Sequence, residues 1–292
     1  MVKKTTIWQQ TQHKALFNAL NVKTNNNKMK HQEITDARVG CRSSRSILDV
    51  NTQLEHFAII SYKVPVEKVE GLIPKPFKLW TFKESGKEYA LVSAVPFKDK
   101  DFSFHRISKL FKFNFFQTNF RTYIIDERDN SHSAWFFGTT LGSVAAIIPK
   151  KIWRMPWEYG SYKFSFKRSN DLYSSYNMEF KSKLGNGLIE IKSTGNDMGL
   201  LNGFKNLDEQ VHVLTHPVIG YYGLSKNQLG TYEIWHPKID LKEGEGNKLY
   251  FELFEKLGFL TRAEMNKPHS VLITSEVEFD ILLPPRKIRV KL

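Results

Sequence analysis

The sequence predicts an α+β protein built mainly on a large antiparallel sheet. Three observations carry this prediction. The chain contains 22 Phe and 11 Tyr residues, which together with many β-branched residues favour strands over a helical bundle. Apolar and polar residues alternate between residues 162 and 191, which is typical of antiparallel strands with one solvated face. Helical spacing is confined to short segments, and no repeat of fixed period is present.

The first 50 residues predict a basic, weakly structured leader, in which residues 14–20 form at most a short helix. This segment holds nine Lys and Arg residues against three Asp and Glu residues, a net charge of 9 − 3 = +6. Its asparagine and serine clusters lack the periodicity that a packed element needs. One compact domain is therefore expected over residues 51–292.

In the first half of this domain, strands are expected where apolar and aromatic residues are dense between turn residues. A short helix is expected at 65–72, with Val66, Val69, Leu72 and Ile73 on one face. The prolines at 74 and 76 end it, because they remove amide donors. The expected strands are 55–63, 89–97, 113–126 and 133–138.

In the second half, residues 139–154 have apolar spacing closer to that of a helix. Residues 248–258 also have helical spacing and end in a C-cap glycine, although a strand is possible for their first half. The expected strands lie around 162–166, 176–180, 188–191 and 271–283. The last is expected to stop at Pro284-Pro285, and the charged segment 286–291 suits an exposed edge strand.

Composition narrows the function classes. The net charge of +13 is compatible with a nucleic-acid partner. Almost half of this excess of positive charge lies in the leader, however, so no nucleic-acid partner is expected. The single cysteine, Cys41, excludes an intramolecular disulfide. No stretch approaches the roughly 20 apolar residues of a membrane span, and the N-terminus lacks an apolar signal core. A soluble, cytoplasmic protein is the expectation.

Two adjacent lysines, Lys150 and Lys151, follow Pro149 at the end of a small, apolar segment. A lysine amine beside a second cation can have a depressed pKa and form a Schiff base at neutral pH. The same pair can also be the basic end of a strand or helix, and both interpretations remain open at this stage. No metal site is expected, because His212 and His216 have metal-compatible spacing but no evident third ligand.

Six segments of the chain follow one another in the order of a known family: 55–62, 66–77, 116–123, 136–141, 269–274 and 280–284. Together they resemble the acetoacetate decarboxylase-like superfamily, and within it the YqjF-like branch of unknown function. The resemblance covers about residues 52–288. It implies a β-rich cone or barrel with a few short helices around a buried pocket, and a homo-oligomer. No cofactor is expected.

The resemblance also implies candidate site residues, in two registers. In acetoacetate decarboxylase the nucleophile is the first lysine of a Tyr-Pro-Lys-Lys motif, which literal matching places at Lys150 with Lys151 beside it. A longer register, aligned on Pro156, places Trp157 where that lysine would be. In the same comparison Gln117 replaces the family's acid and Glu55 stands in place of its arginine.

Two functions follow from these residues. The first is a pocket protein that binds a small anionic or carbonyl-containing ligand without covalent chemistry, using Gln117, Arg121, Lys151 and Trp157. The alternative is a Schiff-base decarboxylase or lyase that acts on a small oxo-acid through Lys150. Arg121 lies mid-strand among aromatic residues. If it points inward, it must meet a carboxylate or an anionic ligand, since a lone buried guanidinium is costly; if it points outward, it is an ordinary surface residue.

Overall fold

A computed structural model describes residues 46, 48–104, 112–144, 147–225 and 227–289 of the chain. All of these belong to one compact unit within residues 35–292. The predicted leader lies outside the described residues as far as residue 45, and so do its helix at 14–20 and Cys41.

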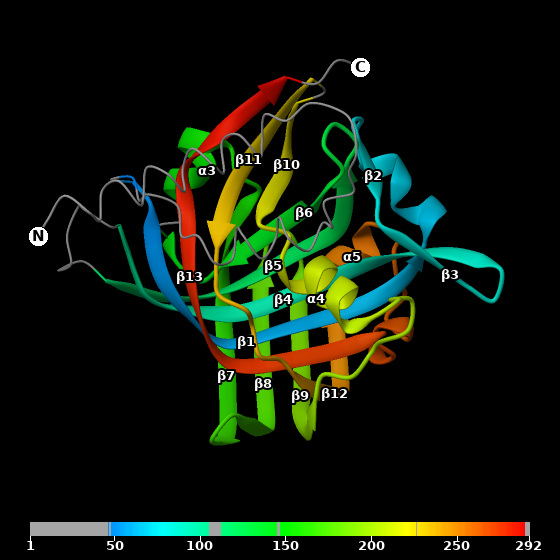
Figure 1. Ribbon diagram of the computed structural model, residues 1–292. Coiled ribbons are helices and arrows are strands. Elements are labelled where there is room, and N and C mark those ends of the chain that lie inside the picture. The colour runs from blue at the N-terminus through cyan, green and yellow to red at the C-terminus, as the bar shows by residue number, and fades with distance from the viewer. Residues whose placement is uncertain (1–45, 47, 105–111, 145–146, 226, 290–292) are drawn as a thin grey trace, which may run out of the picture. The chain divides into compact units, whose positions relative to one another are not determined.

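The described residues form one 13-stranded, mostly antiparallel sheet with a few short helices (Figure 1). This confirms the predicted fold class. The strands are β1 (Val50–Pro65), β2 (Phe77–Leu79), β3 (Thr81–Glu84), β4 (Lys87–Phe104), β5 (Phe113–Asp126), β6 (Ser131–Leu141), β7 (Trp157–Ser169), β8 (Leu172–Ser182), β9 (Asn186–Asp197), β10 (Ile219–Ser225), β11 (Gln228–Trp235), β12 (Lys242–Phe251) and β13 (Ser270–Arg289).

The helices lie between these strands. They are the 3₁₀ turns η1 (Val66–Lys68), η2 (Glu70–Leu72) and η4 (Glu264–Asn266), and the α-helices α3 (Ile147–Trp153), α4 (Leu207–Thr215) and α5 (Glu252–Lys256). None of those that the structure describes is long and apolar enough to cross a membrane.

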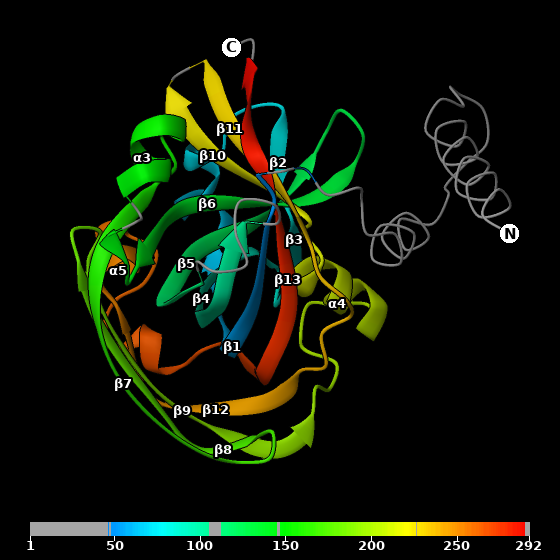
Figure 2. The ribbon, with the colours of Figure 1, turned by 90° about the vertical axis from the view of Figure 1, so that its left-hand side faces the viewer.

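Strand pairing closes the sheet into two rings that share five strands. The path β13-β1-β4-β5-β6 continues through β7, β8, β9 and β12 back to β13, which makes the larger ring (Figure 2). The same five strands also continue through β10 and β11 back to β13, because β10 pairs with β6 and β11 pairs with β13; this makes the smaller ring. The shared strands therefore have an interior on each face.

Period-two alternation distributes the side chains of the shared strands between the two interiors. Even-numbered residues of β5, such as Phe116 and Phe120, join the apolar core that fills the larger ring. The odd-numbered residue Tyr123 faces the other way, into a second core that includes Val213 and Leu214 of α4. Both faces of β5 are covered, so most of its residues beyond Asn114 are buried or half-buried although many of them are polar.

Three helical expectations need correction. Residues 65–72 form two 3₁₀ turns rather than a helix, because only Val69 of the expected face is buried. The helix within 139–154 is limited to α3, since residues 139–141 pair in parallel with β7 and stay extended. In 248–258 the first half is the end of β12, and the short α5 precedes the turn at Gly258.

The final strand does not stop at Pro284-Pro285. β13 runs through both prolines and ends at Arg289, with residues 286–289 paired to β11. The prolines sit where the β11–β13 register shifts, between the pairs Thr231↔Arg286 and Glu233↔Leu282. A proline is tolerated at such an irregularity, because no ladder hydrogen bond is required from its nitrogen.

Closure of the smaller ring depends on a glycine in β11. A Cβ atom at Gly230 would lie 2.1 Å from Cζ of the buried Tyr222 on β10. We expect Gly230→Ala to lower the free energy of unfolding by about 1–3 kcal/mol, because the new methyl group requires the buried Tyr222 ring to shift. Urea unfolding measures this change. Gly71→Ala is the matched control, since a Cβ there meets nothing within 4 Å; equal effects of both variants would contradict the prediction.

Candidate functional site

The candidate site is a pocket inside the smaller ring. All seven strands of that ring contribute to its lining, together with Thr215 at the end of α4 and the segment that follows. Its cavity volume is about 60 Å³. One water needs about 10–15 Å³ of such volume, so the cavity can hold about four to six waters or one slender organic ligand. Aromatic and aliphatic side chains make most of the wall, including Phe57, Phe97, Phe136 and Trp157.

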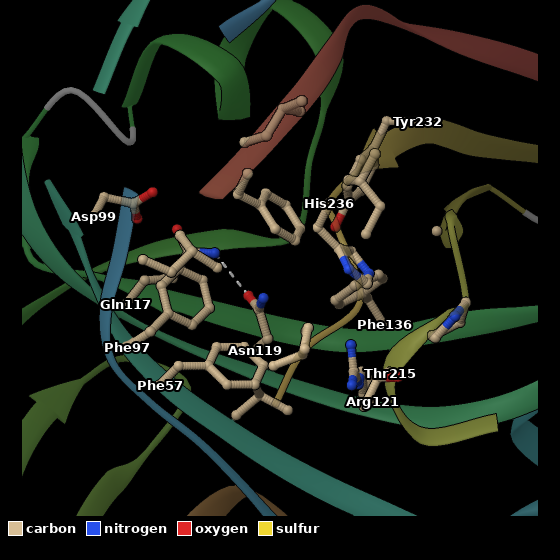
Figure 3. Close-up of a pocket in the computed structure, with 18 of the residues that line it drawn as sticks. Phe57, Phe97, Asp99, Gln117, Asn119, Arg121, Phe136, Thr215, Tyr232 and His236 are labelled. Atoms are coloured by element: carbon tan, nitrogen blue, oxygen red, sulfur yellow. Dashed lines mark hydrogen bonds between the residues drawn. The ribbon is translucent and has the colours of Figure 1, made fainter. Parts of the chain in front are cut away.

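A row of three polar side chains from β5 crosses the pocket (Figure 3). Gln117, Asn119 and Arg121 are successive odd-numbered residues, so they point to the same side of the strand. Asn119 Oδ1 accepts hydrogen bonds from Gln117 Nε2 and from Thr139 Oγ1, both at 2.8 Å. These bonds orient the Gln117 amide with its nitrogen toward Asn119, which leaves its oxygen on the side of Asp99.

Arg121 points inward and is only 8% exposed. Its Nη2 donates a hydrogen bond to the Leu214 carbonyl at 2.9 Å, and the guanidinium lies 5.4 Å from the centre of the Tyr123 ring. Its Nε has no partner, and no carboxylate of the described residues lies within the 4.0 Å of an ion pair. A guanidinium has the fork geometry that suits a carboxylate, and this one is buried with an unused donor and without a counter-charge.

His236 lies at the same end of the pocket as Arg121 and is 1% exposed (Figure 3). Its ring stacks on Phe279, and its Nδ1 donates to the Pro237 carbonyl at 2.7 Å, since a carbonyl can only accept. Burial, with a contribution from the nearby His216, lowers the pKa of His236 to about 4. The imidazole is therefore neutral at pH 7, and its unpartnered Nε2 is a hydrogen-bond acceptor.

Asp99 lies at the opposite end, on β4, and is 2% exposed. Its Oδ1 accepts a hydrogen bond from Thr52 Oγ1 at 3.1 Å, whereas its Oδ2 has no partner. Burial raises the pKa of Asp99 to about 7, and the Thr52 hydrogen bond opposes this shift. The pocket thus has a permanent cation at one end and a carboxyl group that is easily neutralised at the other.

The lysines do not join this pocket. Lys150, on α3, is 45% exposed and forms an ion pair with Glu158, and Lys151 is exposed as well. No lysine of the described residues lines the cavity. Of the residues singled out from the sequence, the structure brings together Gln117, Arg121 and Trp157 and leaves Lys150 and Lys151 outside.

Glu55, which the resemblance aligns with an arginine of the family, lies outside the lining too. Burial alone would raise its pKa, but hydrogen bonds from Lys100 and Lys98 lower it to about 2. Glu55 is therefore an ionised partner of two lysines.

Sequence reasoning missed Asp99, Asn119 and His236. A signal for Asp99 was present, because Val95, Phe97 and Asp99 alternate on one strand and so share a face. The isolated acid in that apolar row was a recognisable exception. His236 had no such signal, since it follows β11 in a loop and reaches the pocket only through the closure of the smaller ring.

Comparison with known proteins identifies the family and the fold. The model of a family described as uncharacterized conserved proteins, DUF2071, matches residues 51–278. A search of curated proteins gave no match.

Solved structures of low sequence identity share the fold. An acetoacetate decarboxylase from Legionella pneumophila superimposes with a TM-score of 0.55 at 12% identity, over 91% of this chain and 98% of that one. The enduracididine biosynthesis enzyme MppR in complex with pyruvate superimposes with a TM-score of 0.55 at 10% identity, over 85% of this chain and 92% of that one. An acetoacetate decarboxylase-like enzyme from Sphingomonas wittichii superimposes with a TM-score of 0.53 at 7% identity, over 84% of this chain and 95% of that one.

The buried carboxyl group predicts a pH-dependent stability. Between about pH 4 and 7 the folded chain keeps a proton on Asp99 that the unfolded chain has lost, so stability falls as pH rises through this range. Asp99→Asn removes the effect and keeps the side-chain size. Urea unfolding from pH 4.5 to 8.5 measures the free energy of unfolding of both proteins. Relative to the wild type, the free energy of unfolding of the variant should rise with pH, by up to about 4 kcal/mol at pH 8.5. Parallel pH profiles for the two proteins would show that Asp99 ionises normally.

Proposed function

The chain belongs to the DUF2071 family of uncharacterized conserved proteins, and we propose that it binds a small carboxylate at Arg121 without forming a covalent bond to it. The observation that supports this proposal is the state of Arg121, a buried guanidinium that faces an apolar pocket with a free Nε donor. A carboxylate would supply the missing counter-charge and accept the unused hydrogen bond. The neutral His236 adds no competing positive charge.

The apolar wall supports a ligand with a carbon skeleton rather than an inorganic anion. Phe57, Phe97, Phe136 and Trp157 offer dispersion contacts to methylene groups, and burying such groups is favourable by about 0.8 kcal/mol for each one. A small organic acid, with or without a carbonyl group, has both parts. Trp157 fills wall space where the longer register expects the catalytic lysine, so it contributes surface and no nucleophile.

Arg121→Met is expected to weaken the binding of butanoate and hexanoate at least about tenfold, because charge-assisted hydrogen bonds contribute about 1.5–3 kcal/mol each. Isothermal titration calorimetry measures the affinities, with the matching neutral amides as ligand controls. Arg121→Lys should retain part of the affinity, since it keeps the charge but loses the planar fork. Arg262→Met is the matched control on the surface. Undiminished binding to Arg121→Met, or equal binding of acids and amides, would contradict the proposal.

The absence of a pocket lysine from the described residues supports a non-covalent function. Borohydride reduction in the presence of acetoacetate or pyruvate should leave every lysine unmodified in peptide mass spectra, because Lys150 is exposed, paired with Glu158 and outside the pocket, and so lacks the apolar surroundings that activate a lysine nucleophile. Lys150→Ala serves as the comparison. A reduced adduct on Lys150 that disappears in this variant would establish the alternative, a Schiff-base decarboxylase or lyase.

Two further expectations complete the proposal. A homo-oligomer is implied by the resemblance to the decarboxylase-like superfamily, and a cytoplasmic location follows from the composition. Both stay predictions, which sedimentation analysis and cell fractionation would measure.

A further inference from the structure

The pocket carries two uncompensated buried groups of opposite charge type, one at each end. Arg121 has no carboxylate partner, and Asp99 has no cation within ion-pair distance among the described residues. The two lysines that flank Asp99 in the sequence, Lys98 and Lys100, point to the other face of β4. Both form ion pairs there with Glu55 of the neighbouring strand β1. Each charged group alone is costly to bury, and the protein supplies the counter-charge to neither.

The Asp99 end presents acceptors. Asp99 Oδ2 is unpartnered, and the Gln117 amide turns its oxygen toward the same side because its nitrogen is bound to Asn119 (Figure 3). Asp99 and Gln117 are diagonal neighbours on β4 and β5, since Asp99 pairs with Phe115 and Phe97 pairs with Gln117. Their two acceptor oxygens, one of them on a carboxyl group, are matched by a ligand group with several N–H donors and a positive charge. An ammonium group meets both requirements, since it has three donors and no acceptor.

We propose that the ligand of this pocket is a linear amino acid whose carboxylate pairs with Arg121 and whose terminal ammonium group is bound by Asp99 and Gln117. This inference rests on the proposed function, because it takes Arg121 as the carboxylate site. It adds the chemical group that the ligand carries at the Asp99 end of the pocket. The apolar wall between the two ends then packs against the methylene chain.

Strand register limits the length of such a ligand. Asp99 pairs with Phe115, and Arg121 lies six residues further along β5. At about 3.3 Å per residue, the two backbone positions are on the order of 20 Å apart. A hydrogen bond of about 3 Å at each end and the two side chains take up part of this distance, so the ligand length is on the order of 10 Å. A chain of intermediate length fits this span, whereas a short amino acid reaches only one end.

Calorimetric titration at pH 7.5 with a homologous series tests the proposal. The series is 4-aminobutanoate, 6-aminohexanoate, 8-aminooctanoate and 12-aminododecanoate, with octanoate and octylamine as partners that lack one charged end. We expect affinity to peak at six or eight carbons. We also expect 8-aminooctanoate to bind at least about tenfold more tightly than octanoate or octylamine.

Variants assign the ammonium site. Asp99→Asn keeps the side-chain size and should reduce affinity for 8-aminooctanoate at least tenfold while changing affinity for octanoate less than twofold. Glu55→Gln is the matched control, since this carboxylate lies outside the pocket lining and should leave both affinities unchanged. Circular dichroism melts verify that each variant is folded.

The outcomes separate this inference from the proposed function. If octanoate binds through Arg121 as tightly as 8-aminooctanoate does, the ammonium site is refuted and the carboxylate site stands. A preference for 8-aminooctanoate that persists in Asp99→Asn also refutes the assignment to Asp99. If neither acid binds and the Arg121 variants change nothing, the proposed function fails together with the inference.

Discussion

The shared wall of five strands is the constraint on which the rest of this structure depends. Because β13, β1, β4, β5 and β6 belong to both rings, most residues in the central parts of β4 and β5 are buried on both faces of this wall. A polar side chain in that buried part cannot reach solvent from either face. It must find a partner in the protein, remain neutral, or line a cavity. The pocket lies where several such side chains meet on the face of the smaller ring.

The interiors of the two rings are filled by different kinds of side chain. The larger ring is filled with apolar and aromatic side chains, and its buried tyrosines, such as Tyr62 and Tyr176, donate hydrogen bonds to backbone carbonyls. The smaller ring holds the second core, which includes Val213 and Leu214 of α4, and members of that core such as Phe57 and Phe97 also line the cavity. The core of the larger ring and the site therefore lie on opposite faces of the shared strands, whereas the site and the second core share residues.

The decarboxylase-like neighbours share the architecture at 7–12% identity, which establishes the fold and leaves the chemistry open. In this chain the exposed Lys150 is neutralised by Glu158, and the pocket is formed by Arg121, Asp99, His236 and aromatic residues. Binding of a charged ligand through these groups requires only that the ligand complete the pairings that the protein leaves open. Under the proposed function, the same fold holds a recognition site without a lysine nucleophile.

The sequence by itself determined the fold class, most strand positions and three of the pocket residues, because strand alternation and local motifs are encoded over a few neighbouring residues. β5 was predicted with the bounds that the structure has, and Gln117 and Arg121 were singled out on it. Only the tertiary structure decided that Arg121 points inward, that Lys150 stays outside, and that Asp99 and His236 complete the site. These facts depend on which distant strands pair: β11 with β13 brings His236 near Arg121, and β4 with β5 sets Asp99 at the other end. Long-range pairing of this kind leaves no periodic signal in the sequence, so the cavity and its two unpaired charged groups emerge only when the smaller ring closes.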